Sequence, residues 1–316
     1  MIDQNSGPVA TSLERPLGAN LEPVLRENCD RLSSISWFRA DWQRGGALTG
    51  FATFQDENDG PRDVVVKLPV PPREKLWLNR LQSAGDVAPR LYASGDELGG
   101  YDMAWVVMER LSHGPLGSKW GGNEFDHVIE AAGRFYLASN EFPAEGEADD
   151  RDWDAINKRS RDNVKRHNVQ NEQRWNKALK KAHKKMGEWT RIWNERSTDG
   201  WVHGDLHMGN AMTRNEPPEG PALLFDFART QRGSWIADGV YLEHLYWARR
   251  DRLGGRKLCK LLAQKRKKLG LAVDKDWSQF AAVRRALMAM STPASLDQHG
   301  NPKHVAAALE VLEREV

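Results

Sequence analysis

The amino-acid sequence changes character near Leu111, and this change limits the fold to one with two unlike parts. Before that point, short runs of β-branched and aromatic residues alternate with polar or glycine-rich turns, a pattern typical of antiparallel strands. After it, apolar residues recur every three or four positions, a pattern typical of amphipathic helices. A sheet followed by helices predicts an α+β fold with two lobes, and 316 residues suffice for both.

The N-terminal part, residues 1–111, is expected to hold one main helix among several strands. Residues 1–20 read as a loose arm, and Leu21–Leu32 reads as a short helix. The helix Glu74–Gln82 follows a proline-rich break, because Pro72 is well placed just before a helix start. The strands predicted in this part are Ile35–Gln43, Leu48–Gln55, Asp63–Leu68, Arg90–Ser94 and Trp105–Leu111.

The C-terminal part, residues 112–316, is expected to be mainly helical. Glu124–Asn140 reads as a helix, and the acidic loop Glu141–Asp154 follows it. A long basic helix comes next, and its segment Lys158–Lys185 carries eleven Lys and Arg residues. Its apolar positions step by three or four residues and are predicted to face the core: Trp175, Leu179, Ala182, Met186, Trp189 and Trp193.

Two apolar strands are expected inside this helical part. Gly200–His203 and Ala222–Phe227 are predicted to form a hairpin-like pair around a loop, and the chain from Trp235 onward is predicted to be helical.

Composition excludes several classes of protein. The formal net charge is only +2, so the whole-chain balance implies neither a nucleic acid nor a membrane as partner. Cys29 and Cys259 stand far apart, which argues against a disulfide framework and against a zinc cluster. The first twenty residues contain no apolar core of signal-peptide length, and no stretch is long enough to span a membrane. These features favour a cytoplasmic protein.

The residues with the clearest chemistry lie between positions 201 and 228. The segment Trp201–Asn210 reads Trp-Val-His-Gly-Asp-Leu-His-Met-Gly-Asn, and Phe225-Asp226-Phe227 follows it. One strand would deliver Asp205 into a loop that returns Asn210 five positions later, and a second strand would end at Asp226. Carboxylate and amide oxygens are ligands that suit Mg²⁺ beside substrate phosphates.

This pair of motifs resembles the aminoglycoside phosphotransferase and choline kinase group, which shares the protein-kinase-like fold. The resemblance is specific over Trp201–Ala228 and looser from Val64 to about His244. It implies a bilobal ATP- and Mg²⁺-dependent phosphotransferase that transfers the γ-phosphoryl group to a small-molecule hydroxyl. In this group the position of Asp205 is the catalytic base, and the positions of Asn210 and Asp226 hold the metal.

The same resemblance assigns roles upstream and downstream of the motif. Lys67 would contact the phosphates of ATP, and Glu74 would hold Lys67 in place. Glu109 and Leu111 would belong to a hinge whose backbone binds adenine. Asp238 would steady the catalytic loop, and His203 and His207 are expected to shape that loop through hydrogen bonds.

The sequence also departs from the kinase pattern. The candidate for a glycine-rich phosphate loop is Arg44-Gly45-Gly46-Ala47, which lacks the G-x-G-x-x-G spacing and leaves Gly45 and Gly46 as weak nucleotide-binding candidates. Gly204 stands where protein kinases have Arg, and no Ala-Pro-Glu follows Asp226. These departures favour a small-molecule kinase over a classical protein kinase.

Several alternatives stay open at the level of sequence. His203, Asp205 and His207 alternate, so an extended strand would place all three on one face, as in a metal-hydrolase site. The basic helix leaves open a nucleic-acid-binding adaptor, although a solvated basic face is the default. The basic segments suit an anionic acceptor such as a lipopolysaccharide sugar, whereas the acidic loop suits an aminoglycoside or an amino alcohol.

Overall fold

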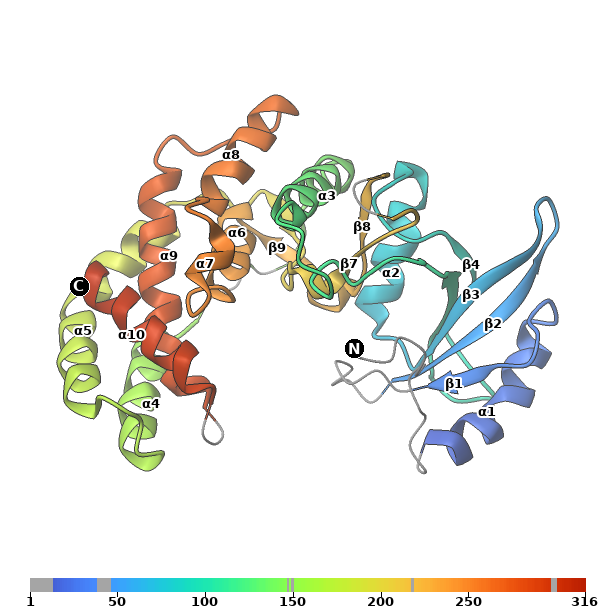
Figure 1. Cartoon of the computed structure of the whole chain (residues 1–316), viewed down its shortest axis with the longest axis horizontal. Helices are drawn as coiled ribbons and strands as arrows, with labels where there is room; N and C mark the ends of the chain where they lie inside the picture. The colour runs from blue at the N-terminus through green and yellow to red at the C-terminus, as the bar shows by residue number, and fades with distance from the viewer. Residues whose placement is uncertain (1–13, 39–46, 147, 149–150, 217–218, 297–299) are drawn as a thin grey trace. The chain divides into compact units, whose positions relative to one another are not determined.

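The computed structural model describes residues 14–38, 47–146, 148, 151–216, 219–296 and 300–316. The chain divides into two compact units, and each unit is built from more than one segment of the sequence (Figure 1). The first unit contains residues 1–118 and 209–230, and the second contains residues 119–208 and 231–316. The antiparallel sheet near the N-terminus and the mainly helical C-terminal region confirm the predicted α+β class.

The first unit is organised around a five-stranded antiparallel sheet in the order β1-β2-β3-β5-β4. Its strands are β1 (Ser36–Phe38), β2 (Leu48–Asp56), β3 (Gly60–Leu68), β4 (Leu91–Gly95) and β5 (Trp105–Glu109). All five predicted strands are present, most with shifted ends, and residues 39–43 of the predicted strand Ile35–Gln43 lie outside the described residues. β2 and β3 extend beyond the predicted Leu48–Gln55 and Asp63–Leu68 because Asp56 accepts hydrogen bonds from the N–H groups of Asn58 and Asp59, which closes a tight turn.

Alternation along β3 determines which residues enter the core. Val64, Val66 and Leu68 are fully buried, whereas Val65 and Lys67 are half-buried on the other face. The buried face joins a cluster that includes Leu25, Phe54 and Trp105. Because successive strand residues point to opposite faces, burial of Val66 and Leu68 directs Lys67 away from this cluster.

The N-terminal helix α1 (Glu14–Asn28) begins seven residues earlier than predicted, so positions 14–20 of the expected arm are helical. Within the added turns, Gly18 lies so close to the Trp37 ring that a Cβ atom there would be 2.8 Å from ring carbons. Glu22 then accepts hydrogen bonds from the backbone N–H of Ile35 at 3.0 Å and from Nε1 of Trp37 at 3.2 Å.

Helix α2 (Pro72–Arg80) and a second sheet complete the first unit. α2 begins at Pro72, within two residues of the predicted start, and continues into the 3₁₀ turn Leu81–Ala84. The second sheet pairs β7 (Ala211–Thr213) with β8 (Ala222–Leu224). Backbone hydrogen bonds connect it to earlier residues, from Leu116 N–H to Ala211 O and from Leu224 N–H to Val87 O.

The predicted pairing of Gly200–His203 with Ala222–Phe227 is wrong. β6 (Gly200–Val202) pairs with β9 (Gln231–Gly233), whereas β8 pairs with β7. Both missed partners are only three residues long, which is too short for the alternation of side chains to reveal them.

The second unit is mainly helical. The predicted helix at Glu124–Asn140 is confirmed as α3, and the predicted helical character after Trp235 is confirmed. The helices of this unit are α3 (Glu124–Ser139), α4 (Trp153–Arg166), α5 (Glu172–Asn194), α6 (Trp235–His244), α7 (Arg250–Leu253), α8 (Leu258–Lys268), α9 (Trp277–Ser291) and α10 (Pro302–Glu315). Within the described parts of the chain, no helix is both long and apolar enough to cross a membrane.

The single long basic helix expected from the sequence is two helices, α4 and α5. The break lies at residues 167–171, where Asn168 and Asn171 adopt positive φ angles of 46° and 63°. Asn tolerates this left-handed conformation better than most residues, so it can end one helix and start the next. The apolar stripe of α5 is buried as predicted, since its Trp residues at 175, 189 and 193 are at most 5% exposed.

Candidate functional site

Lys67 and Glu74 form a close ion pair in the first unit. The ammonium Nζ of Lys67 donates to both carboxylate oxygens of Glu74, at 2.7 and 2.8 Å. The side chain of Glu74 is 2% exposed and that of Lys67 is 18% exposed. Burial raises the pKa of Glu74, and the charge of Lys67 opposes this rise. The predicted partnership of these two residues is present.

Asp226 lies close enough to this pair for its charge to act on it. The carboxylate of Asp226 also raises the pKa of Glu74, and helix α2 packs against the 3₁₀ turn Phe227–Arg229 that follows Asp226. Asp226 itself has a left-handed backbone, with φ and ψ both 62°. Strained residues of this kind occur frequently at ligand and switch sites.

Asn210 lies beside the end of β8 through the register of the second sheet. Ala211 pairs with Leu224, and the N–H of Phe225 donates to the carbonyl oxygen of Asn210 at 3.2 Å. Asn210 is 6% exposed. The two predicted metal ligands therefore flank the same strand pair, Asn210 just before β7 and Asp226 just after β8. An amide and a carboxylate form an oxygen donor set that suits Mg²⁺, which takes few protein ligands.

Asp205 lies in the second unit, in a loop held by Asp238 of α6. The carboxylate of Asp238 accepts hydrogen bonds from the backbone N–H groups of His203 at 2.8 Å and Gly204 at 2.9 Å. The N–H of Asp205 donates to Nδ1 of His203 at 3.3 Å. Asp238 thus steadies the loop and His203 shapes it, as predicted. Burial raises the pKa of Asp238.

Two tyrosines of the second unit that the sequence did not reveal take part in this network. The hydroxyl of Tyr136, on α3, donates to Asp238 at 2.9 Å, and burial raises its pKa well above the usual value. The hydroxyl of Tyr241, on α6, donates to Oδ1 of Asp205 at 2.5 Å. The available signal was the three-residue spacing of Asp238 and Tyr241, which places both on one helix face.

The extended arrangement required for a metal-hydrolase site is absent. β6 ends at Val202, so His203, Asp205 and His207 follow the strand rather than alternate along it. His203 is fully buried, and Nε2 of His207 lies 3.8 Å from Oδ1 of Asp205. In the described part of the chain, no group of three or more His, Cys, Asp or Glu side chains could hold a metal ion.

Of the predicted hinge residues, Glu109 is the last residue of β5, and Leu111 lies two residues after the strand. The carboxylate of Glu109 accepts two hydrogen bonds from Arg214, at 2.6 and 2.9 Å, and Arg214 also donates to Asp86. Leu111 is 8% exposed, and among the described residues its backbone N–H has no hydrogen-bond partner. Arg214 was not identified from the sequence, because its role depends on which strands pair.

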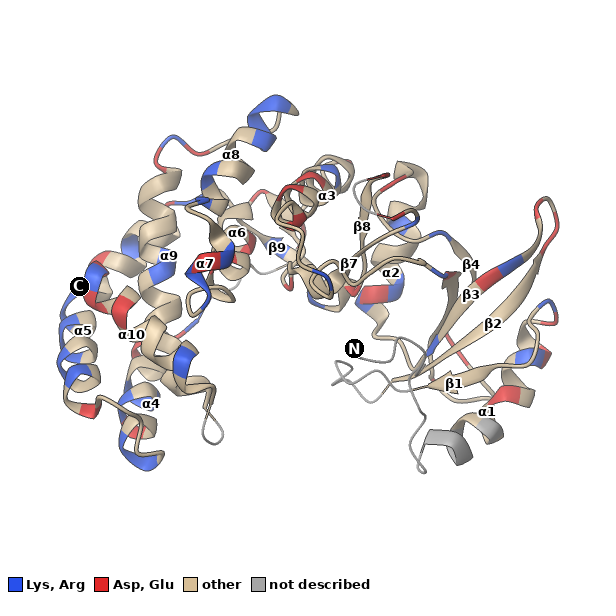
Figure 2. Cartoon of the chain, viewed as in Figure 1, with Lys and Arg blue, Asp and Glu red and all other residues tan. Residues whose placement is uncertain are grey.

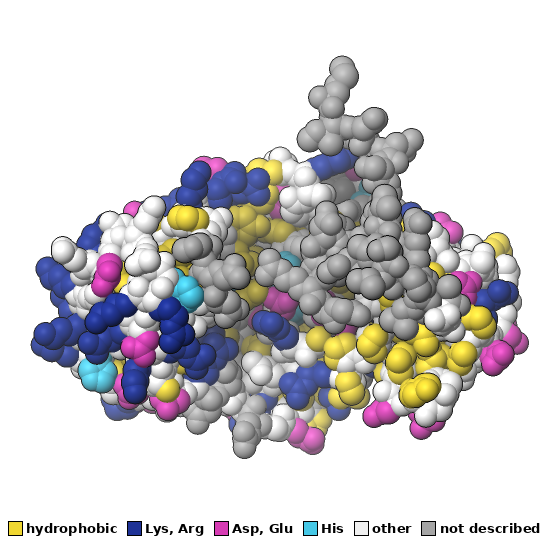
Figure 3. Space-filling model, turned by 90° about the horizontal axis from the view of Figure 1, so that it is seen from below, with side chains coloured by type: hydrophobic (Ala, Val, Ile, Leu, Met, Phe, Trp, Pro, Cys, Tyr) yellow, Lys and Arg dark blue, Asp and Glu magenta, His cyan; other side chains and the backbone are white. Residues whose placement is uncertain are grey.

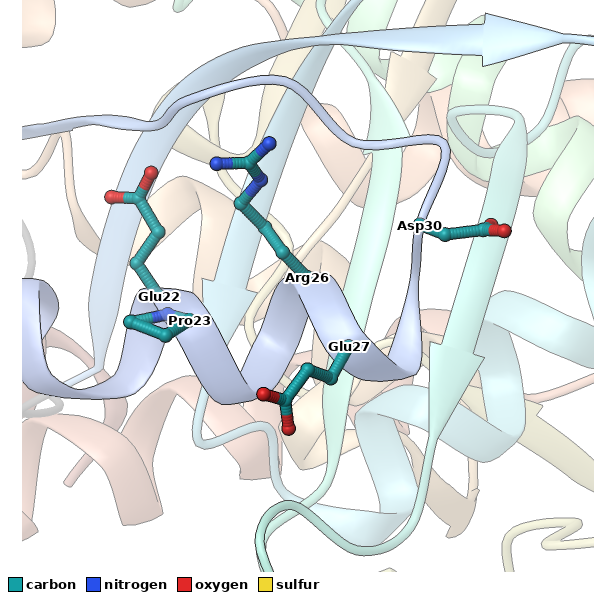
Figure 4. A pocket seen from close by; sticks show the side chains of 5 residues that line it. All are labelled: Glu22, Pro23, Arg26, Glu27 and Asp30. Carbon is teal, nitrogen blue, oxygen red and sulfur yellow. The ribbon is translucent and has the colours of Figure 1, made fainter.

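Gly45 and Gly46 lie outside the described residues, so their predicted role stays a prediction. A surface hollow of about 520 Å³ lies along α1, and Figure 4 shows its lining of Glu22, Pro23, Arg26, Glu27 and Asp30. None of the predicted site residues lines it. The hollow therefore adds nothing to the candidate site.

The basic residues of α4 and α5 form a solvent-exposed surface of the second unit (Figures 2 and 3). Of the eleven Lys and Arg residues between positions 158 and 185, Lys185 is half-buried and the others are exposed. Arg174 pairs with Glu313 at 2.6 Å. The Trp residues of α5 are buried and so cannot stack on bases.

The sequence model of the phosphotransferase enzyme family matches residues 42–268, which is more than half of the chain and includes Lys67, Asp205 and Asp226. A comparison with curated proteins gives no match.

Solved structures share the fold at low sequence identity. An aminoglycoside phosphotransferase from Alicyclobacillus acidocaldarius is 14% identical with a TM-score of 0.55, covering 99% of this chain and 94% of its own. The choline kinase LicA from Streptococcus pneumoniae is 13% identical with a TM-score of 0.54, covering 96% and 100%. A microcompartment-associated aminopropanol kinase is 12% identical with a TM-score of 0.53, covering 93% and 94%. These similarities confirm the predicted fold.

Proposed function

Because the chain belongs to the phosphotransferase enzyme family, we propose that it transfers the γ-phosphoryl group of ATP to a hydroxyl group of a small molecule in a Mg²⁺-dependent reaction. The observation that carries this proposal is the ion pair of Lys67 and Glu74 with Asp226 in electrostatic range. A half-buried lysine held by a buried glutamate can contact phosphates, and an aspartate in range of this pair can hold the metal that binds beside them.

The residues of the first unit fit a nucleotide. Lys67 supplies a positive charge on a side chain that remains partly exposed, and Glu74 fixes its direction. The N–H of Leu111 is a buried donor without a described partner, and an adenine ring offers an acceptor nitrogen to such a group. We therefore propose ATP, rather than another nucleotide, as the phosphoryl donor.

The donor set of Asn210 and Asp226 fits a magnesium ion held jointly with phosphate oxygens. When bound, the ion neutralises charge that develops on the phosphates during transfer. Within the chain, the amide of Asn210 and the carboxylate of Asp226 provide oxygen ligands at the same end of the β7–β8 pair, because Ala211 pairs with Leu224. The charge of Asp226 is therefore proposed to serve metal binding.

Asp205 is proposed as the base that orients the acceptor hydroxyl. Its carboxylate accepts the hydroxyl proton while the acceptor oxygen bonds to the γ-phosphorus and the bond to the β–γ bridging oxygen breaks, releasing ADP. Tyr241 and the loop of His203 and Gly204 limit the orientations open to this carboxylate. A fixed base accelerates transfer because the orientation is set before reaction.

The acceptor class is proposed from the named relatives, which include an aminoglycoside phosphotransferase, a choline kinase and an aminopropanol kinase. We favour a small amino alcohol or aminoglycoside. A sugar of lipopolysaccharide type and a protein hydroxyl are the alternatives within the same fold.

An acceptor panel tests the function. ATP consumption with Mg²⁺ is measured with choline, 1-amino-2-propanol, kanamycin, a phosphorylated sugar and casein, and phosphorylated product is identified by mass spectrometry. Turnover with one hydroxyl acceptor and its loss in Asp205→Asn, with ATP binding retained, is the expected result. Binding of Mg·ATP without consumption across a broad panel would instead favour a nucleotide-binding adaptor.

A further inference from the structure

The side chain of Tyr241 contacts the proposed catalytic base directly. Its hydroxyl donates to Oδ1 of Asp205 at 2.5 Å, and both residues belong to the second unit. The side chain of Asp205 is 20% exposed, so water can reach it as well. The Tyr241 hydroxyl, a donor fixed by the protein, therefore competes with mobile water for the hydrogen bond to Oδ1 of Asp205.

Tyr241 and Asp238 act from the same face of α6, because they are three residues apart on the helix. Asp238 accepts from the N–H groups of His203 and Gly204, and Tyr241 donates to the side chain of the next residue, Asp205. Three consecutive residues of the loop are thus held by one helix face. The two backbone contacts fix where the loop lies, and the contact of Tyr241 fixes a side-chain direction.

We propose that Tyr241 is a positioning residue that sets the orientation of the Asp205 carboxylate for the acceptor hydroxyl. This inference rests on the proposed function of Asp205. The terminal torsion of an aspartate side chain is broad, so a carboxylate without a fixed donor samples many orientations. A donor at Oδ1 narrows that range, and small misplacements of reacting groups cost large factors in rate.

Packing of the ring does not depend on the hydroxyl. The ring centroids of Tyr241 and His244 are 4.9 Å apart, and a Phe at position 241 would retain this contact. Tyr241→Phe therefore removes the donor with little loss of packing. The matched control is Tyr246→Phe, because Tyr246 packs against Phe125 at 4.9 Å and its hydroxyl has no hydrogen-bond partner among the described residues.

Steady-state kinetics with an acceptor found active for the wild type provide the test. We expect Tyr241→Phe to lower kcat about 10-fold, less than the ~10²–10⁴-fold that a general base itself contributes. The KM values for ATP and for the acceptor should stay within about twofold, because no substrate contact is lost. Tyr246→Phe should leave kcat and both KM values close to those of the wild type.

A double-mutant comparison separates positioning from general structural support. In the background of Asp205→Asn, Tyr241→Phe should not lower the remaining rate further, because the carboxylate it orients is gone. The role of Tyr241 would be overturned, with the proposed function left intact, by either of two results. One is an unchanged kcat in Tyr241→Phe; the other is an equal fold-loss of rate from Tyr241→Phe in the wild type and in Asp205→Asn. If the wild type turns over no acceptor and Mg·ATP is not consumed, the proposed function itself fails, and the role of Tyr241 fails with it.

Discussion

The ammonium group of Lys67 contacts both carboxylate oxygens of Glu74, at 2.7 and 2.8 Å, although the two side chains come from a strand and from the helix after it. The carboxylate is almost completely removed from solvent, and burial alone would favour its neutral form. The lysine therefore stabilises a charge that the surrounding protein disfavours, and the glutamate in turn limits where the lysine can point.

Glu74→Gln tests this mutual dependence. We expect KM for Mg·ATP to rise about 10-fold, because the amide no longer fixes Lys67. Unfolding free energy should fall by roughly 1–3 kcal/mol, below the ~3–5 kcal/mol for fully buried pairs, because Lys67 remains partly exposed. ATP kinetics and urea unfolding measure the two effects. The control is Asp96→Asn, whose partner is Lys75 at 2.6 Å and whose own side chain is 84% exposed. Unchanged ATP kinetics in Glu74→Gln would contradict the assigned role.

Asp226→Asn tests the proposed metal ligand without disturbing the backbone. Asn tolerates the left-handed conformation at position 226 nearly as well as Asp does, whereas Ala does not. We expect turnover to fall ~10²–10³-fold, the equivalent of several kcal/mol of metal-ion stabilisation. The concentration of Mg²⁺ for half-maximal activity should rise in a titration. As a control, Tm should fall less in Asp226→Asn than in Asp226→Ala. If Asp226→Asn needs the same Mg²⁺ concentration for half-maximal activity as the wild type, Asp226 is not a metal ligand.

Arg214→Gln tests whether the hinge is fixed by the second sheet. Arg214 follows β7 directly and binds the carboxylate of Glu109 through two hydrogen bonds. We expect KM for ATP to rise about three- to tenfold with little change in kcat, because a partly exposed, charge-assisted contact at the proposed hinge is lost. Calorimetric titration of ATP provides an independent value.

The control for this variant is Arg62→Gln, which removes an arginine from a surface pair with Asp59 in the same unit. Equal ATP affinities for the two variants would show that the contact between Arg214 and Glu109 does not support nucleotide binding.

His244 makes the stability of the second unit depend on pH. Burial lowers its pKa from 6.5 to about 4, and nearby His304 and Arg284 add to the shift. Because the folded-state pKa is depressed, the unfolded chain binds a proton first as the pH falls. Stability should therefore be complete above about pH 6.5 and be lost toward pH 4, by about 3 kcal/mol in total.

Thermal unfolding between pH 4 and 7.5 measures this effect, and the slope of Tm against pH is the relevant quantity. Burial lowers the pKa of His304 too, so both histidines contribute to the wild-type slope. His244→Asn should flatten the slope over this window even if it lowers Tm at every pH. A slope equal to that of the wild type would assign the pH dependence to other groups.

Much of the site arrangement could be predicted from sequence because its residues are tied to local patterns. The alternation Val64, Val66, Leu68 directs Lys67 to the opposite face, and the proline-rich break places Glu74 in the first turn of a helix. These are short-range consequences of strand and helix periodicity. The pairing of Lys67 with Glu74 was implied by the family resemblance, and these local patterns are consistent with it.

The failures concern choices that local patterns do not determine. Strands of three residues such as β7 and β9 carry no readable alternation, so the partners of β6 and β8 could not be deduced. The break between α4 and α5 depends on two Asn residues that could equally be helical. The partner of the Tyr241 hydroxyl is set by how α6 meets the preceding loop, which is a tertiary relationship.

The division of the chain has a consequence for synthesis on the ribosome. The first unit includes residues 209–230, and its sheet β7–β8 is bonded to Val87 and Leu116. A nascent chain that has reached Ser118 therefore still lacks part of its N-terminal unit, and the missing strands emerge only after α3, α4 and α5 have been made. Completion of the first unit must wait until residues 119–208, about half of the second unit, have been made, so translation speed across them becomes a variable in the yield of folded enzyme.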